Sequence, residues 1–372
     1  MKTILIITTV CLCCVSSTFA QSKIELTPGQ PDRFRDLLIT PISAVSKIAL
    51  PQQKINVVGT PGYLTSFRAS GDGNIIISNG DGRFLDRSMT NARLDTSLNV
   101  SEPNLNVGYY VSNNGNWLIR ILYNTELDQS EMQYIDFVTK QIMYTFELEG
   151  AFGETAFSSD ANTFAHISKS SRSLVTRKGS EFQTDLVPNT KGNPIISSSG
   201  DRVFTEIEFE DESRRHALIE RSADGWSEPS FFSLYDHDLN ELEFKIRDVA
   251  NDGDTLLIRA ESRGLAVVNG KNNEWGLPEF LDFQWQLPFS NRYSISEDGN
   301  VVLIESLREE DGIIDYIDLF LFIKQDDGEW KQQKVNPDGV DASPGAILTK
   351  DGSKVFWIPW QTMSSVEYDV YK

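Results

Sequence analysis

The chain has few of the residues on which most catalytic and metal sites depend. Its 372 residues include three cysteines and three histidines. The cysteines are Cys11, Cys13 and Cys14, so the chain beyond residue 20 has no thiol nucleophile, no disulfide and no cysteine metal site. The sequence also lacks a Gly-x-Ser-x-Gly elbow and a phosphate-binding loop. A chain of this length can bury a sufficient core without disulfides.

Positive charge is also scarce. The chain has 34 lysines and arginines against 54 acidic residues, which gives a formal net charge of −20. Such a chain is repelled by nucleic acid and by anionic membranes, so we exclude both as partners. An acidic surface keeps a protein soluble, and it is also compatible with cations or basic proteins as partners.

A long apolar run occurs at the N-terminus. Lys2 precedes an apolar stretch over residues 4–15, and Thr18-Phe19-Ala20 resembles a cleavage site with small residues. This order is typical of a secretory signal peptide, and the run is too short to span a bilayer. We therefore expect residues 1–20 to be removed and the mature chain to be secreted, or periplasmic in a bacterial host, without membrane insertion.

A five-residue unit of the form Ser-x-Asp-Gly-Asn recurs seven times, each time followed by an apolar run. The copies are residues 70–74, 112–116, 158–162, 197–201, 250–254, 296–300 and 349–353. A recurrence of roughly 40 to 50 residues is the period of a four-stranded propeller blade.

Each unit has the chemistry of a hairpin tip. Asp or Asn followed by Gly turns a chain tightly because glycine accepts a positive φ. The leading Ser or Thr can cap the same loop, and runs such as 75–77 and 301–304 suit strands. Ala161 replaces the glycine in the third copy. There we expect Asn162 to take the positive φ, or the turn type to change.

The sequence thus predicts an all-β fold, a seven-bladed β-propeller over residues 62–372. The last blade is one strand short at the C-terminus, and the segment 21–61 holds spare strand-forming runs. We expect an N-terminal strand, from 55–58 or 43–50, to complete that blade and to bury its open edge. Without helical periodicity or a break in composition, we expect a single propeller domain and a monomer.

The turns and the strands behind them resemble the WD40-like propeller repeats of the C-terminal domain of TolB. A Trp-x-x-Pro element late in the blade, at 226–229 and 275–278, is a second matching feature, and Trp330 keeps the Trp without the Pro. The resemblance implies a propeller that binds partners more often than it catalyses. The chain lacks the Trp-Asp strand ends of true WD40 repeats and the residue spacing of the sialidase Asp box.

The connection between blades four and five contains the first candidate site, Asp236-His237-Asp238. An Asp-His-Asp run can bind a metal or orient a base, although a flexible acidic loop is the alternative interpretation. His166 and His216 fall in expected strands, where we expect structural roles.

A second candidate site is Gln284-Trp285-Gln286, in the next connection between blades. A Trp flanked by amides can hold a sugar ring by stacking and hydrogen bonding, and the alternative is an aromatic wedge between blades. Asn99 begins an Asn-Val-Ser sequon, which predicts glycosylation if secretion passes through an endoplasmic reticulum.

Different classes of function stay open at this point. The first is a secreted binding or scaffold module for a protein or glycan partner, because no catalytic set is evident. The second is a secreted hydrolase or lyase, with metal assistance from 236–238. The third is an extracellular protein whose acidic clusters at 208–212, 309–311 and 325–327 engage calcium or a matrix, although none has EF-hand spacing.

Overall fold

The computed structural model describes most of the chain between Lys54 and Val370. The described residues are 54–56, 67–78, 84–86, 105–149, 154–167, 172–186, 190–261, 263–271, 274–282, 292–310, 313–337, 342, 345–357 and 364–370. The predicted signal segment 1–20, the sequon at Asn99 and the run Gln284–Gln286 lie outside them. Among the described residues, no helix is long and apolar enough to span a bilayer.

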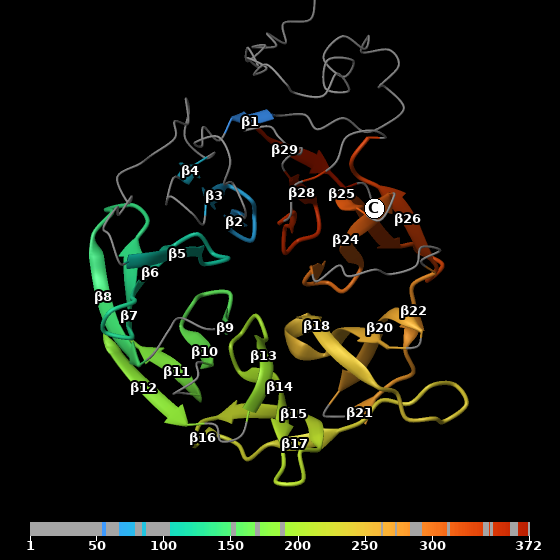
Figure 1. Cartoon of the computed structure of the whole chain (residues 1–372), viewed down its shortest axis with the longest axis horizontal. Helices are drawn as coiled ribbons and strands as arrows, with labels where there is room; N and C mark the ends of the chain where they lie inside the picture. The colour runs from blue at the N-terminus through green and yellow to red at the C-terminus, as the bar shows by residue number, and fades with distance from the viewer. Residues whose placement is uncertain are drawn as a thin grey trace, which may run out of the picture.

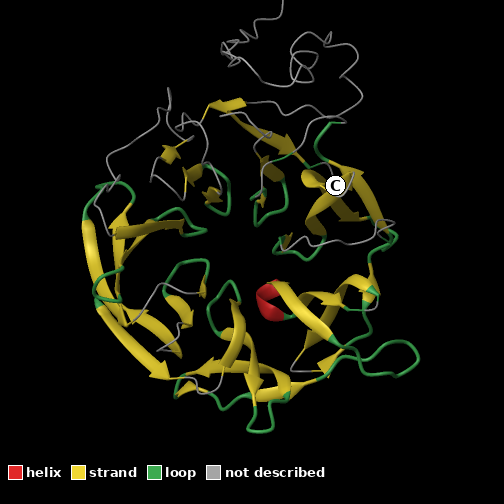
Figure 2. Cartoon of the chain, viewed as in Figure 1, coloured by secondary structure: helices red, strands yellow, loops and turns green. Residues whose placement is uncertain are grey.

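The described residues form seven antiparallel sheets arranged in a ring around a common centre (Figure 1). Each sheet contains one of the seven repeated turns, so we number the sheets as blades 1 to 7 in chain order. The one helical element in this part of the chain is the 3-10 turn η1 (Asn251–Gly253), drawn in red in Figure 2. The predicted all-β propeller fold is confirmed.

The strands of a blade follow one another outward along the chain (Figure 1). The innermost strands are β2 (Phe67–Ala69), β5 (Leu105–Val111), β9 (Glu154–Phe157), β13 (Thr190–Ile196), β18 (Phe244–Ala250), β23 (Tyr293–Ile295) and β27 (Ile347–Leu348). The second strands are β3 (Ile75–Ser78), β6 (Trp117–Asn124), β10 (Thr163–Ile167), β14 (Arg202–Glu208), β19 (Thr255–Ala260), β24 (Val301–Glu310) and β28 (Lys354–Trp357).

The remaining strands complete the blades toward the rim. The third strands are β4 (Phe84–Asp86), β7 (Gln129–Asp136), β11 (Arg172–Lys178), β15 (Arg214–Ser222), β20 (Gly264–Lys271), β25 (Ile313–Lys324) and β29 (Ser364–Asp369). The outer strands are β8 (Ile142–Glu149), β12 (Glu181–Leu186), β16 (Gly225–Trp226) with β17 (Ser230–Phe232), β21 (Glu274–Trp275) with β22 (Glu279–Phe280), β26 (Trp330–Lys334) and β1 (Lys54–Asn56).

The N-terminal strand β1 completes blade 7. It runs antiparallel to β29, with Ile55 opposite Ser365 and Asn56 opposite Ser364. The prediction of closure by an N-terminal strand is therefore confirmed, and the run that contains Ile55 supplies it. The other candidate segment, 43–50, lies outside the described residues. Pairing the two ends of the chain covers an edge that would otherwise be open.

Side chains in the repeated turn form one hydrogen-bond pattern. In blade 1, Ser70 Oγ donates to Asp72 Oδ1 (2.6 Å) and accepts the buried N–H of Ile75 (3.0 Å). The same carboxylate oxygen accepts the N–H of Asn74 (2.9 Å). Equivalent bonds occur in the turns that begin at Ser112, Ser158, Ser296 and Thr349. The Ser and Asp are thus required because they pair N–H groups that the turn leaves without a backbone partner.

The expectation for the third turn was wrong, because Ala161 itself adopts the positive φ of 57°. Asn162 does not, since its N–H is held by Asp160 Oδ1 (2.9 Å) as in the other turns. The N–H of Ala161 also donates to Ser158 O (2.9 Å), as glycine does elsewhere. The Ala161 side chain is fully buried, and burying a methyl group offsets part of the strain of about 1–2 kcal/mol.

Backbone hydrogen bonds join the turns to one another around the centre. The second residue of a turn donates its N–H to the carbonyl of the second residue in the next turn, and we call this circle the inner ring. Its bonds are Gly71 to Asn113 (2.7 Å), Asn113 to Ser159 (2.8 Å), Ser159 to Ser198 (2.9 Å), Asn251 to Glu297 (2.7 Å), Glu297 to Lys350 (2.6 Å) and Lys350 to Gly71 (3.1 Å).

The step from blade 4 to blade 5 is different. Ala250 replaces the leading Ser in blade 5, and Asn251 and Asp252 both have positive φ (47° and 54°). Side chains bridge this step instead: Ser199 N–H donates to Asp252 Oδ1 (2.8 Å). The Glu297 carboxylate of blade 6 also accepts bonds from both Ser198 Oγ and the Asp252 N–H (3.1 Å). Without the serine hydroxyl, the turn has rearranged and its inner-ring bond is replaced.

The apolar core lies between the blades. Val301 and Leu303 of β24 pack toward blade 7, whereas Val302 and Ile304 pack toward blade 5. In blades 2 to 6 both faces of the sheet contribute to such clusters, which explains why the strands behind the turns are apolar without alternation.

The Trp-x-x-Pro elements interrupt the outer strand. β16 and β17 are separate pieces that both pair with β15, and β21 and β22 are separate pieces that both pair with β20. Blade 6, which has Trp330 without the Pro, has one continuous outer strand, β26. Trp226, Trp275 and Trp330 each pack against a core cluster shared with the preceding blade.

Replacing Ser296 by Ala should destabilise the fold. The change removes the acceptor of the Val301 N–H (2.9 Å), and leaving such a buried donor unpaired costs about 1–3 kcal/mol. Ser353→Ala is the control, because that hydroxyl donates only to the exposed Asp351 carboxylate, and its effect should stay within about 0.5 kcal/mol. Urea unfolding measures both; equal losses would contradict the role assigned to the leading serine.

Candidate functional site

The seven turns lie at one end of the blades and form a polar surface, which we call the tip face. Their 35 residues include eight acidic side chains and one basic side chain, Lys350. The third residue of the turn is exposed in six of the seven copies. At Asp72, burial opposes ionisation, but hydrogen bonds from Ser70 and Asn74 outweigh it and lower its pKa. The tip face is therefore acidic, with its side chains held in place by the turns.

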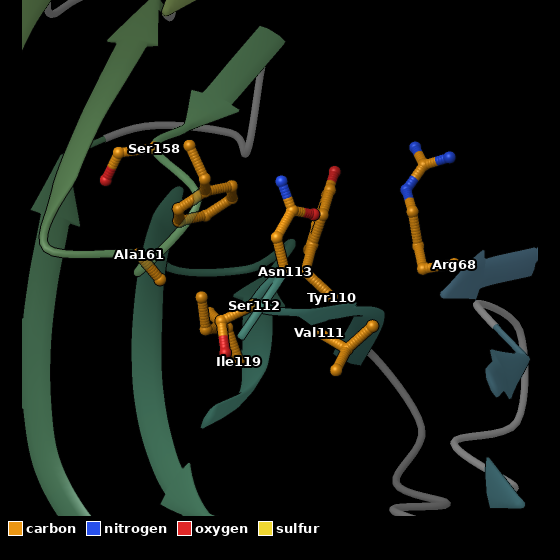
Figure 3. A pocket seen from close by; sticks show the side chains of 9 residues that line it. Arg68, Tyr110, Val111, Ser112, Asn113, Ile119, Ser158 and Ala161 are labelled. Atoms are coloured by element: carbon orange, nitrogen blue, oxygen red, sulfur yellow. The ribbon is translucent and has the colours of Figure 1, made fainter. Parts of the chain in front are cut away.

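A cavity of about 260 Å³ lies beneath the tip face between blades 2 and 3 (Figure 3). Tyr110 and Phe157 form part of its wall, with ring centroids 5.1 Å apart and planes at 50°. Arg68 of blade 1 lies over the Tyr110 ring, 5.2 Å from its centroid. Asn113 and Ala161 also line the cavity. It thus combines aromatic surface, one cation and one amide.

Beside this cavity, Arg177 of blade 3 lies against three rings of blade 2. Its guanidinium carbon is 4.7 Å from the Trp117 centroid, 5.2 Å from Tyr134 and 4.8 Å from Tyr144. Tyr134 donates its hydroxyl proton to Ala161 O (2.8 Å), and burial raises its pKa. These cation–π contacts tie blades 2 and 3 together.

A second cavity, of about 310 Å³, lies between blades 4 and 5. Arg202 pairs with Glu220 (3.1 Å) and Asp254, and Arg221 pairs with Asp201 (2.7 Å). Asp201 and Asp254 occupy the fifth position of their turns, where the other copies have Asn or Ser. The Arg202–Asp254 pair crosses from blade 4 to blade 5, so this cluster links the blades where the inner-ring bond is replaced.

The structure places the sequence-predicted run Asp236-His237-Asp238 in the connection between β17 and β18, which projects beyond the rim of the ring (Figure 1). Asp236 is 2% exposed and pairs with Arg263 Nη2 (2.6 Å). Its Oδ1 accepts the N–H groups of Asp238 (2.8 Å) and Asn240 (2.9 Å). The bond from Asn240 is the main cause that lowers the Asp236 pKa. His237 and Asp238 are exposed at the tip of this loop.

Among the described residues, no group of three or more His, Cys, Asp or Glu side chains is arranged to hold a metal ion. The metal assignment for 236–238 stays a prediction, with the Asp236 carboxylate engaged inside the loop. The second predicted site, Gln284, Trp285 and Gln286, lies outside the described residues.

Two of the three histidines occupy strand positions. His216 stacks on Phe244 with ring centroids 4.0 Å apart, and its Nε2 is 2.9 Å from Phe244 O. Burial lowers the pKa of His216, so the ring is neutral near pH 7. His166 in β10 is fully buried. Both positions fit the structural roles expected from the sequence.

Comparison with known proteins shows the fold of this chain but not its function. No family model and no curated protein matches the sequence. Among solved structures, the β-propeller domain of Cps50 (Swd1) from Myceliophteria thermophila is 14% identical, with a TM-score of 0.53 over 86% of this chain and 99% of that one. A chain of the mitotic checkpoint complex is 11% identical, with a TM-score of 0.57 over 87% and 95%.

A third similar structure is a chain of hydrazine synthase from Kuenenia stuttgartiensis. It is 13% identical, with a TM-score of 0.54 over 84% of this chain and 97% of that chain. The three likenesses agree with the antiparallel sheets in showing a WD40-like β-propeller. At these identities they carry no activity or partner across to this chain.

Removing the Asp236 carboxylate tests whether it is structural. Asp236→Ala leaves two N–H groups and Arg263 without their acceptor, so the melting temperature should fall by several degrees at pH 7. Folding lowers the pKa of Asp236. The contribution of this carboxylate to the stability of the folded protein is therefore complete above the unfolded-state pKa, and it is lost as pH falls through the folded-state pKa. The difference in melting temperature between Asp236→Ala and the unmodified protein should therefore become smaller in acid.

The control is Asp238→Ala, which removes an exposed carboxylate two residues away and should leave the melting temperature unchanged. Thermal unfolding monitored by circular dichroism between pH 3 and pH 7 measures both variants. An Asp236→Ala protein as stable as the control would show that the carboxylate does not hold the loop.

Proposed function

We propose that this protein is a secreted β-propeller that binds a protein or glycan partner and serves as a scaffold. The observation that carries the proposal is the inner ring, which fixes the turns of all seven blades relative to one another. A preorganised surface loses little conformational entropy on binding, so it suits a binding role. The N-terminal segment 1–20, with its apolar core, supports secretion.

The acidic tip face favours a partner with a basic surface. Of the eight acidic side chains, Asp201 and Asp254 are paired with arginines, and the other six outnumber the one basic side chain, so the field over the turns is negative. Such a field speeds association with a basic protein and disfavours acidic ones. A protein partner with exposed lysines or arginines therefore fits this surface better than a neutral glycan does, and a glycan remains the alternative within the same proposal.

The similar structures support the same kind of role. One of them is a chain of the mitotic checkpoint complex, which is an assembly of proteins. Another belongs to hydrazine synthase, an enzyme by its name. For this chain we favour binding over catalysis, because the Asp236 carboxylate, which the catalytic alternative would use, is already bound by Arg263.

Capture from native extracellular medium tests the proposal. The mature chain should recover a reproducible partner, and capture should weaken with rising salt because exposed charges are screened. The tip-face variant is Asp72→Asn with Asp298→Asn and Asp351→Asn. Asn114 naturally makes the same turn bonds with Ser112 (2.7 Å) and with the Asn116 N–H (3.1 Å), so this variant should fold. Capture should fall at least about tenfold.

The matched control removes three charges from turns at the other end of the strands: Glu126→Gln with Glu210→Gln and Glu212→Gln. These side chains are exposed, so the change in net charge is the same without a change to the tip face. Quantitative mass spectrometry of the captured proteins compares the variants. Nothing reproducible captured, or equal capture by both variants, would contradict a role for the tip face.

A further inference from the structure

Arg247 of β18 and Arg259 of β19 lack the acidic partners that other arginines of the chain have. Arg202, Arg221 and Arg263 each form an ion pair with an aspartate. Among the described residues, neither Arg247 nor Arg259 forms an ion pair or a side-chain hydrogen bond. In a chain with 54 acidic residues against 34 basic ones, two half-buried arginines without a counter-charge are an exception that needs an explanation.

Strand pairing brings a third basic side chain to the same place. Lys245 of β18 lies directly opposite Arg259 of β19, so the two side chains are on one face of the sheet. The next pair along, Ile246 and Ile258, packs toward blade 4, so Lys245 and Arg259 are on the side of blade 6. Like charges directly opposite each other destabilise a strand pair, and an anion bound beside them would remove this repulsion.

Arg247 joins this pair through an irregularity in β18. The register of β18 against β19 shifts between Ile246 and Asp248, which makes Arg247 the extra residue of a β-bulge. Its guanidinium carbon lies over the Tyr293 ring of blade 6, 5.6 Å from the centroid, so its charge is also on the blade 6 side. Bulges often re-aim a side chain next to a functional site. We call Lys245, Arg247 and Arg259 the basic cluster; its strand β18 lies beside the centre of the ring (Figure 1).

The position of the Arg247 guanidinium is costly for the protein alone. Its Nε–H is buried and has no hydrogen-bond partner, and such a donor is rare in a folded protein. Burial is the main cause that lowers the pKa of Arg247, and the charge of Arg259 lowers it further, whereas Tyr293 and Glu206 of blade 4 raise it. A bound anion would satisfy the donor and balance both guanidinium groups.

The carboxylates near the basic cluster do not neutralise it. Asp248 follows Arg247 in the chain, but its two oxygens accept the N–H groups of Val249 (2.9 Å) and Ile295 (3.0 Å). Glu206 of blade 4 forms no ion pair with Arg247 among the described residues. Three basic side chains beside two carboxylates leave this part of an acidic protein with a net positive charge.

We propose that the basic cluster binds a tetrahedral oxyanion, namely a phosphate or a sulfate group. Two guanidinium groups and one ammonium group offer more charge and more N–H donors than the two oxygens of a carboxylate can use. Arg247 and Arg259 are half-buried and Lys245 is exposed, so a small anion reaches them from solvent. Phosphate esters and sulfated sugars share this chemistry. The site does not depend on the partner proposed for the tip face, and its test uses small anions alone.

Titration of the mature chain with inorganic phosphate at constant ionic strength, followed by NMR of the arginine Nε–H groups, tests the site. The Arg247 Nε–H signal should shift with a Kd on the order of 1 mM. Acetate should bind at least about tenfold more weakly, because it has one charge and two oxygens. At about 50 mM phosphate the melting temperature should rise by about 3 °C, since the anion binds the folded state.

Two variants locate the binding. Arg247→Gln and Arg259→Gln should each weaken phosphate binding at least about tenfold, because each removes a guanidinium group. Without phosphate, Arg259→Gln should melt no lower than the unmodified chain, since the change removes a repulsion and no hydrogen bond. An arginine with a purely structural role would lower the melting temperature and leave phosphate binding unchanged.

The matched control is Arg215→Gln in blade 4. Arg215 also lies over a ring, 5.2 Å from the Phe209 centroid, and is exposed, so this variant has the same net charge and should bind phosphate as the unmodified chain does. Inorganic sulfate separates the sources: tighter binding of phosphate indicates a phosphate ester, and tighter binding of sulfate indicates a sulfated sugar. Equal phosphate binding by Arg247→Gln, Arg259→Gln and the control, or equal binding of acetate and phosphate, would overturn the proposal.

Discussion

The structure depends on the backbone hydrogen bonds that join consecutive turns at the centre. Six steps of the inner ring have an N–H to carbonyl bond between second residues, from 2.6 to 3.1 Å. Each bond requires the turn to present that peptide at one fixed position. The Ser and Asp side chains provide this position by pairing the other N–H groups of the turn. A repeat of five residues thus determines both the hairpin of each blade and the closure of the ring.

The two departures from the repeat have different consequences. Ala250 removes a hydroxyl, and the step between blades 4 and 5 is held by the Asp252 side chain and by the Arg202–Asp254 pair instead. Ala161 adds a methyl where a glycine usually stands, and a cavity lies between the blades there. The first departure coincides with an ion pair between the blades, and the second coincides with a cavity lined by residues of three blades. In a regular repeat protein, such exceptions are where a site can differ from its neighbours.

The sequence predicts the fold well because the signals are local. The turn at 296–300, the apolar run behind it and the spare strand near Ile55 each follow from neighbouring residues. The positive φ at Ala161 was missed because the shared turn geometry, and not the residue's own preference, determines it. The cavity was also missed, since Arg68, Tyr110 and Phe157 come from three blades and meet only when the ring closes.

Hydrogen exchange at the second residue of each turn tests the inner ring most directly. The amides of Asn113, Ser159 and Glu297 each donate to the next turn. They should exchange slowly and at similar rates, because opening any of them separates two blades. The amide of Ser198 has no such acceptor among the described residues, and it should exchange much faster. Equal protection of Ser198 and Ser159, or loop-like exchange at all of these amides, would contradict a ring held by these bonds.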